Sequence, residues 1–157
     1  MKRILIAVSA LFIFFAACKD ADKKSDGKLS AEAMRAKVDS LYTSVIDEHD
    51  AGMSGWMKIE GRQKQINSLL DSIAKLPANT QASLADLKAK LNEVNTALSN
   101  AYQEMDVWMT AMNLDSAAEN LEIRIKYLTD EKLKGSRITE MINSSMQKAD
   151  SLLKTKL

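Results

Sequence analysis

The chain has 157 residues, with 22 basic and 21 acidic side chains, one histidine, one proline and one cysteine. Because the charges nearly balance, the composition argues against binding to a nucleic-acid backbone, which requires a clustered positive surface. One cysteine excludes a disulfide within the chain. One histidine argues against a zinc site and against a Ser-His or Cys-His nucleophile pair, so we predict no catalytic residues.

The first 17 residues have the features of a secretory signal peptide. Lys2 and Arg3 precede an apolar run over residues 4–15, which is too short for a membrane span. The sequence Phe-Ala-Ala-Cys that ends this run resembles the lipobox of bacterial lipoproteins, whose cysteine carries acyl chains such as palmitate. We therefore expect lipidation of Cys18, and the alternative is a cleaved periplasmic protein without an anchor.

Residues 18–29 are polar and charged, with no large apolar side chain before Leu29, and are predicted to form a flexible tether. Residues 30–157 show helical rather than strand-like patterning and are predicted to form one helical-bundle domain. In the first helix of this domain, apolar residues recur at steps of four and three from Val38 to Ile73, and Ser30 is a suitable N-cap. Three glycines on this helix indicate a kink or a close approach by another helix: Gly52, Gly55 and Gly61.

Pro77 is predicted to end the first helix, and the next helix has a heptad seam over residues 84–112. Residues 113–115 then suggest an interruption. A short helical stretch is predicted over 116–128, with Thr129 capping a final helix.

The predicted fold is therefore all-α, an elongated three-helix bundle built on a long antiparallel helical hairpin. The first two helices are expected to be the longest. A count of four helices follows if residues 116–128 pack separately.

A Met-x-x-Trp-Met segment occurs on each arm of the predicted hairpin. The first contains Met53, Trp56 and Met57, and the second contains Met105, Trp108 and Met109, with Met112 one turn further on. The only histidine, His49, lies one turn before Met53. In an antiparallel hairpin that turns near residue 78, four of these residues fall within one helical turn of a common level. These four are His49, Met53, Met105 and Met109.

Three interpretations of this cluster stay open. Thioethers and a neutral imidazole are ligands for Cu(I), with Met57 and Met112 as auxiliary ligands and Trp56 and Trp108 as an aromatic wall. A non-covalent haem with His and Met axial ligands is a second interpretation. The third is ordinary core packing, since methionine fills irregular gaps and Met105, Trp108 and Met112 lie on the heptad seam.

The order of these segments resembles a family of small bacterial lipoproteins often labelled viral A-type inclusion proteins, a label that carries no established function. The elements that carry the resemblance are Cys18, residues 49–53, residues 105–109, Tyr127-Leu128 and Glu131-Lys132. The resemblance implies an envelope lipoprotein, lipid-anchored on the periplasmic or surface side of the outer membrane.

Two functional classes follow from these residues and motifs. The first is a non-catalytic structural or protein-interaction module, whose partner is another envelope protein or a second copy of the chain. The second is a copper-handling protein that binds Cu(I) through the His/Met cluster. The predicted partners otherwise comprise the membrane, through the lipid, and no nucleic acid.

Overall fold

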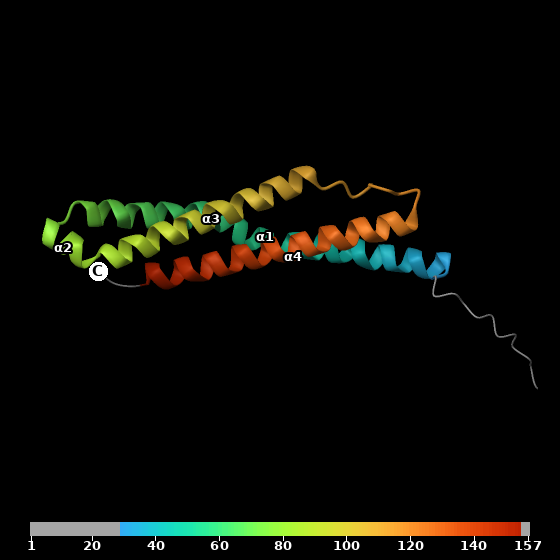
Figure 1. Ribbon diagram of the computed structural model, residues 1–157, viewed down its shortest axis with the longest axis horizontal. Coiled ribbons are helices and arrows are strands. Elements are labelled where there is room, and N and C mark those ends of the chain that lie inside the picture. The colour runs from blue at the N-terminus through green and yellow to red at the C-terminus, as the bar shows by residue number, and fades with distance from the viewer. Residues whose placement is uncertain (1–28, 155–157) are drawn as a thin grey trace, which may run out of the picture.

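The computed structural model describes residues 29–154 and confirms the all-α prediction. These residues form four helices and no strand: α1 (Ala31–Ala74), α2 (Ala78–Ser83), α3 (Ala85–Ala111) and α4 (Leu121–Leu153) (Figure 1). None of the four is both long and apolar enough to cross a membrane. The predicted signal peptide, the predicted lipidation site Cys18 and most of the predicted tether lie outside the described residues.

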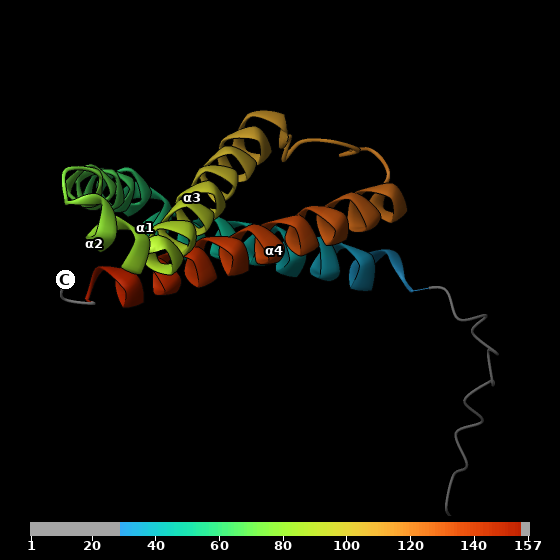
Figure 2. The ribbon, with the colours of Figure 1, turned by 60° about the vertical axis from the view of Figure 1, so that its left-hand side comes forward.

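The three long helices pack along one another and α2 is a short element at one end (Figures 1 and 2). α1 and α4 run in the same direction and α3 runs antiparallel to both. α1 packs more extensively on α4 than on α3. The prediction that the first two helices are the longest is wrong, because α4 has 33 residues and α3 has 27.

The predicted apolar face of α1 is buried at every second position, while Tyr42 on the same predicted face is 39% exposed. Six residues at heptad spacing are buried along its length: Val38, Val45, Gly52, Ile59, Ile66 and Ile73. The Ser30 hydroxyl accepts a hydrogen bond from the Ala33 backbone N–H at 3.2 Å, which confirms the predicted N-cap. Because apolar residues that recur every seven positions stay on one side of a long helix, α1 contacts the other helices along most of its length.

Two of the three glycines on α1 mark a close approach to α4. A Cβ atom at Gly52 would lie 3.0 Å from Thr139 Oγ1, and one at Gly55 would lie 2.5 Å from Ile142 Cγ2. Gly61 has no such neighbour within 4 Å. The Thr139 hydroxyl also donates a hydrogen bond of 2.9 Å to the Glu48 carbonyl oxygen of α1. The absence of side chains on α1 thus allows close packing of α1 on α4 at this level.

The first connection contains a short helix that the sequence analysis did not predict. α1 ends at Ala74, as expected from Pro77, and Pro77 is the N-cap of the additional helix α2 (Ala78–Ser83). The Gln81 amide on α2 donates hydrogen bonds to the carbonyl oxygens of Ala74 and Leu76, at 3.0 and 2.7 Å. These bonds satisfy carbonyl groups that the end of α1 leaves without helical partners.

The second connection differs from the prediction. Residues 116–128 do not form a separate helix and Thr129 does not begin one, because α4 starts at Leu121 and continues through both segments. Asn120 is the cap: its side-chain oxygen accepts from the N–H groups of Glu122 and Ile123, both at 3.1 Å. The Thr129 hydroxyl instead donates to the Ile125 carbonyl oxygen within the helix, which is compatible with a mid-helix position.

Candidate functional site

The two tryptophans of the repeated motif have different environments. Trp56 on α1 is half-buried and stacks on Tyr102 of α3, with ring centroids 4.6 Å apart and an interplanar angle of 12°. Its indole N–H donates to the Tyr102 carbonyl oxygen at 3.1 Å. Trp56 therefore joins α1 to α3, and both its ring and its polar atom are satisfied within the chain.

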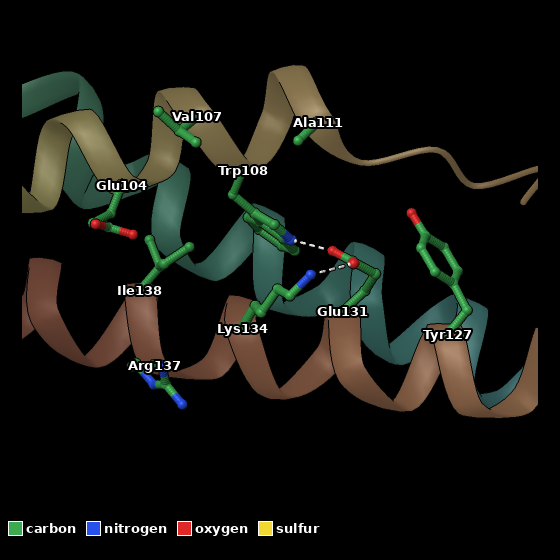
Figure 3. Close-up of a pocket in the computed structure, with 9 residues that line it drawn as sticks. All are labelled: Glu104, Val107, Trp108, Ala111, Tyr127, Glu131, Lys134, Arg137 and Ile138. Carbon is green, nitrogen blue, oxygen red and sulfur yellow. Dashed lines mark hydrogen bonds and ion pairs between the residues drawn. The ribbon is translucent and has the colours of Figure 1, made fainter.

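Trp108 on α3 is buried and joins α3 to α4. Its indole N–H donates to Glu131 Oε2 at 2.8 Å, and Glu131 Oε1 accepts from the Lys134 ammonium at 2.7 Å (Figure 3). Glu131 is only 4% exposed, so its carboxylate needs these two donors to offset the loss of water. The hydrogen bond to this carboxylate raises the pKa of Lys134 above its ordinary value.

A glycine on α4 makes room for the Trp108 ring. A Cβ atom at Gly135 would lie 2.7 Å from Trp108 Cη2 and 3.0 Å from the Glu48 Cβ atom of α1. Both distances are shorter than ordinary carbon–carbon contacts.

The sequence pattern did not indicate that Glu131 belongs to this region, because it placed this residue in the first turn of a later helix. Glu131 instead occupies an interior position of α4.

His49 lies beside Trp108 but is not enclosed. The two ring centroids are 6.4 Å apart, the planes are tilted by 48°, and 28% of the His49 side chain is exposed. His49 Nδ1 lies 3.0 Å from the Asp50 carboxylate, which is 72% exposed. The imidazole therefore already has one polar partner, at the edge of the bundle.

The methionines of the predicted cluster are spread from the core to the surface. Met105 is fully buried and packs against Gly52 of α1, one turn from His49. Met57 is 67% exposed. Three others are half-buried against the core: Met53, Met109 and Met112. Within residues 29–154, no group of three or more His, Cys, Asp and Glu side chains is arranged to hold a metal, so a metal site here would depend on His49 and thioethers.

A cavity lies between α3 and α4, and neither His49 nor any methionine lines it. It has a volume of about 440 Å³, and the Trp108, Glu131 and Lys134 side chains lie along it (Figure 3). Val107, which lines this cavity, is 55% exposed. α3 and α4 diverge toward this end of the bundle in both ribbon views.

Two smaller cavities continue along the same pair of helices. One, of about 160 Å³, is lined by residues that include Ala97 of α3 and Ser144 of α4. The other, of about 230 Å³, is lined by residues that include Glu93 and Lys148. We call this row of three cavities the α3–α4 groove. Because α1 covers the other side of the helix pair, the groove marks the side of α3 and α4 that no helix of the described chain covers.

Comparison of the chain with protein-family models, with curated proteins and with solved structures found no match.

Proposed function

We propose that the chain is a lipid-anchored, non-catalytic interaction module of the bacterial cell envelope. In this proposal Cys18 carries the acyl chains and residues 18–29 form the tether. The three long helices then act together as one elongated bundle. The lipobox-like sequence, the polar tether and the resemblance to small envelope lipoproteins support the anchor.

The observation that carries the proposal is that the polar groups around Trp56 and Trp108 are satisfied within the chain, whereas the groove beside Trp108 stays open. In the Trp/Met region, each indole N–H has a partner inside the chain, and the buried Glu131 carboxylate has two. Such satisfied groups stabilise helix packing and leave few polar atoms for a ligand. The α3–α4 groove, in contrast, keeps open volume and the exposed Val107. An unfilled seam between two helices is where a partner helix packs in helical assemblies.

Copper binding is the second candidate function. It is supported by the position of the partly exposed His49 beside Trp108, and by Met105 of α3, which packs against α1 one turn from His49. Against it, His49 already faces Asp50, and Met105 is fully enclosed by apolar neighbours. We therefore favour packing as the role of the cluster.

Membrane fractionation tests the anchor. We expect the wild-type chain in the membrane fraction, with labelled palmitate incorporated, and the Cys18→Ser variant unlabelled and released. A wild-type chain that stays unlabelled would contradict the lipid anchor.

Photo-crosslinking in intact cells tests the interaction surface. A photoreactive residue at Val107 reports on the groove, and the same residue at Leu133 is the matched control. Both positions are exposed and apolar, at 55% and 61%, but Leu133 does not line any of the three cavities. We expect a protein adduct from position 107 and none from position 133. Absence of an adduct at both positions would contradict an interaction module.

A further inference from the structure

The charges along the α3–α4 groove are separated by helix. The acidic residues that line it from α3 are Glu93 and Glu104. The α4 side contributes Arg137 and Lys148, together with Glu131 and Lys134, whose charges offset each other in an ion pair. In the described part of the chain, none of the other four side chains forms an ion pair. Lys90 is the one basic residue on the α3 side, at the end of the groove. The rim therefore has a mainly acidic edge on α3 and a mainly basic edge on α4. Four of its charged residues are left without ion-pair partners in the described chain: Glu93, Glu104, Arg137 and Lys148.

The acidic and basic groups also lie at matching levels. Glu93 shares its cavity with Lys148, and Glu104 shares its cavity with Arg137. A twofold axis parallel to the helices would leave each residue at the same position along the bundle. It would place α3 of one copy over α4 of the other. Glu93 would then face Lys148 of the second copy, and Glu104 would face its Arg137, each pair occurring twice.

We propose that the α3–α4 groove is the interface of a parallel homodimer, with the helices of two copies packed face to face. A twofold axis perpendicular to the helices would instead set the basic edge of α4 against the same edge of the other copy. Like charges so placed repel, so the charge pattern selects the parallel arrangement. The apolar contacts would come from residues that line the groove and keep exposed surface, including Val107 and Met141.

The parallel arrangement rests on the proposed function and also deepens it, since it names the partner as a second copy. A twofold axis along the bundle places the start of α1 in both copies at the same end. Two lipid anchors can then enter one membrane, whereas an antiparallel dimer would hold them at opposite ends of a long bundle. Confinement to one membrane also raises the effective concentration, so that a modest interface suffices for dimerisation.

Charge reversal tests the interface. All the described contacts lie within residues 29–154, so a chain of residues 19–157 contains every residue that makes them. Its molar mass is measured by sedimentation equilibrium at increasing concentration. We expect a dimer whose dissociation constant rises about tenfold or more in Glu104→Lys and in Arg137→Glu. The double variant should return close to the wild-type value. The matched control is Glu140→Lys, an exposed α4 position outside the cavity linings, and it should leave the constant unchanged.

A cysteine cross-link gives a second, independent measurement that does not depend on the charge variants folding. The chain of residues 19–157 has no native cysteine, so single cysteines can be placed at Ala97 and Ser144, which line the middle cavity from opposite helices. Mixing the Ala97→Cys chain with the Ser144→Cys chain should give a disulfide-linked dimer of the two different chains. Cross-linking that is faster between identical chains would overturn the parallel arrangement.

Different outcomes overturn the homodimer and the proposed function. A chain that stays monomeric in solution, and gives an adduct from position 107 only with a different protein, would overturn the homodimer while leaving the interaction module intact. An adduct in cells with twice the mass of the chain supports the homodimer. A dimer that is insensitive to both charge reversals would overturn the assignment of this face.

Discussion

The buried carboxylate of Glu131 links α3 to α4 through its hydrogen bond with Trp108. Its two oxygens accept from Trp108 and Lys134, and it is nearly excluded from solvent. Removing one donor from a buried carboxylate leaves an uncompensated desolvation cost, which exceeds the worth of an ordinary hydrogen bond. Trp108 therefore has a polar role in addition to its apolar contacts.

Replacing each tryptophan by phenylalanine separates these roles. Trp108→Phe should lower the free energy of unfolding by about 1.5–3 kcal/mol, because the carboxylate loses a donor. Trp56→Phe loses a hydrogen bond to a backbone carbonyl at a half-buried position, and should cost about 0.5–1.5 kcal/mol. Urea unfolding followed by circular dichroism measures both. A Trp56→Phe variant that is the less stable of the two would contradict the role given to Glu131.

The Lys134–Glu131 pair predicts a pH dependence at alkaline pH. The pKa of Lys134 is raised in the folded state, chiefly by its hydrogen bond to Glu131. The stabilisation is therefore fully present below the unfolded-state pKa of 10.5 and is lost as the pH rises through the folded-state pKa. The difference in unfolding free energy between wild type and Lys134→Met should shrink at strongly alkaline pH. A difference that stays constant between neutral and strongly alkaline pH would contradict this assignment.

A Cu(I) competition titration on residues 19–157 tests the alternative role of the His/Met cluster. If the cluster is packing, binding stays at the chelator background, and His49→Ala and Met105→Leu behave like wild type. Met105→Leu keeps the side-chain volume and removes the thioether, so it leaves the core filled. Tight one-to-one binding that weakens about tenfold in both variants would instead establish a soft-metal site.

At the scale of the elements, glycines decide how closely the helices approach. Gly135→Ala should lower the free energy of unfolding by about 1–3 kcal/mol, since the new Cβ atom would press on the fixed Trp108 ring. Gly61→Ala has open space and should raise it by about 0.5–1 kcal/mol through helix propensity. Thermal and urea unfolding of the two variants should therefore change in opposite directions. Stabilisation by both alanines would mean that α4 does not approach Trp108 as closely as described.

The helices with a regular apolar repeat could be predicted from the sequence, whereas the start of α4 could not. The heptad residues of α1, from Val38 to Ile73, are buried as expected. The start of α4 was missed because Thr129 resembles an N-cap by residue type, while Asn120 makes the actual capping bonds. With α4 starting at Leu121, the helical repeat places Glu131 on the buried face of the helix. Lys134, with which it pairs, follows three residues later.

Only part of the candidate site could be predicted from the sequence. The antiparallel register placed Trp56 and Trp108 on facing helices, and Trp56 does contact α3 through Tyr102. Their polar partners come from backbone and from α4, which no residue pattern of the first two helices indicates. The α3–α4 groove is a property of how two helices diverge, and such divergence depends on side-chain sizes along the whole contact.

At the scale of the whole molecule, the bundle is a long object with one uncovered helix pair. α1 covers one side of α3 and α4, and the groove lies on another side with its charges separated between the two helices. In the proposed dimer a second copy covers this side in parallel, with both membrane anchors at one end.

The most direct test is the distance between two spin labels attached at Ala33→Cys in residues 19–157. Ala33 is exposed in the first turn of α1, at the end nearest the proposed anchor. The parallel dimer predicts a separation of about 30 Å, because the two α1 helices are three layers apart at about 10 Å each. Pulsed electron paramagnetic resonance measures this range. Labels about 60 Å or more apart would indicate an antiparallel dimer along the 44-residue α1, and absence of dipolar coupling would indicate a monomer. Either result would contradict the parallel dimer.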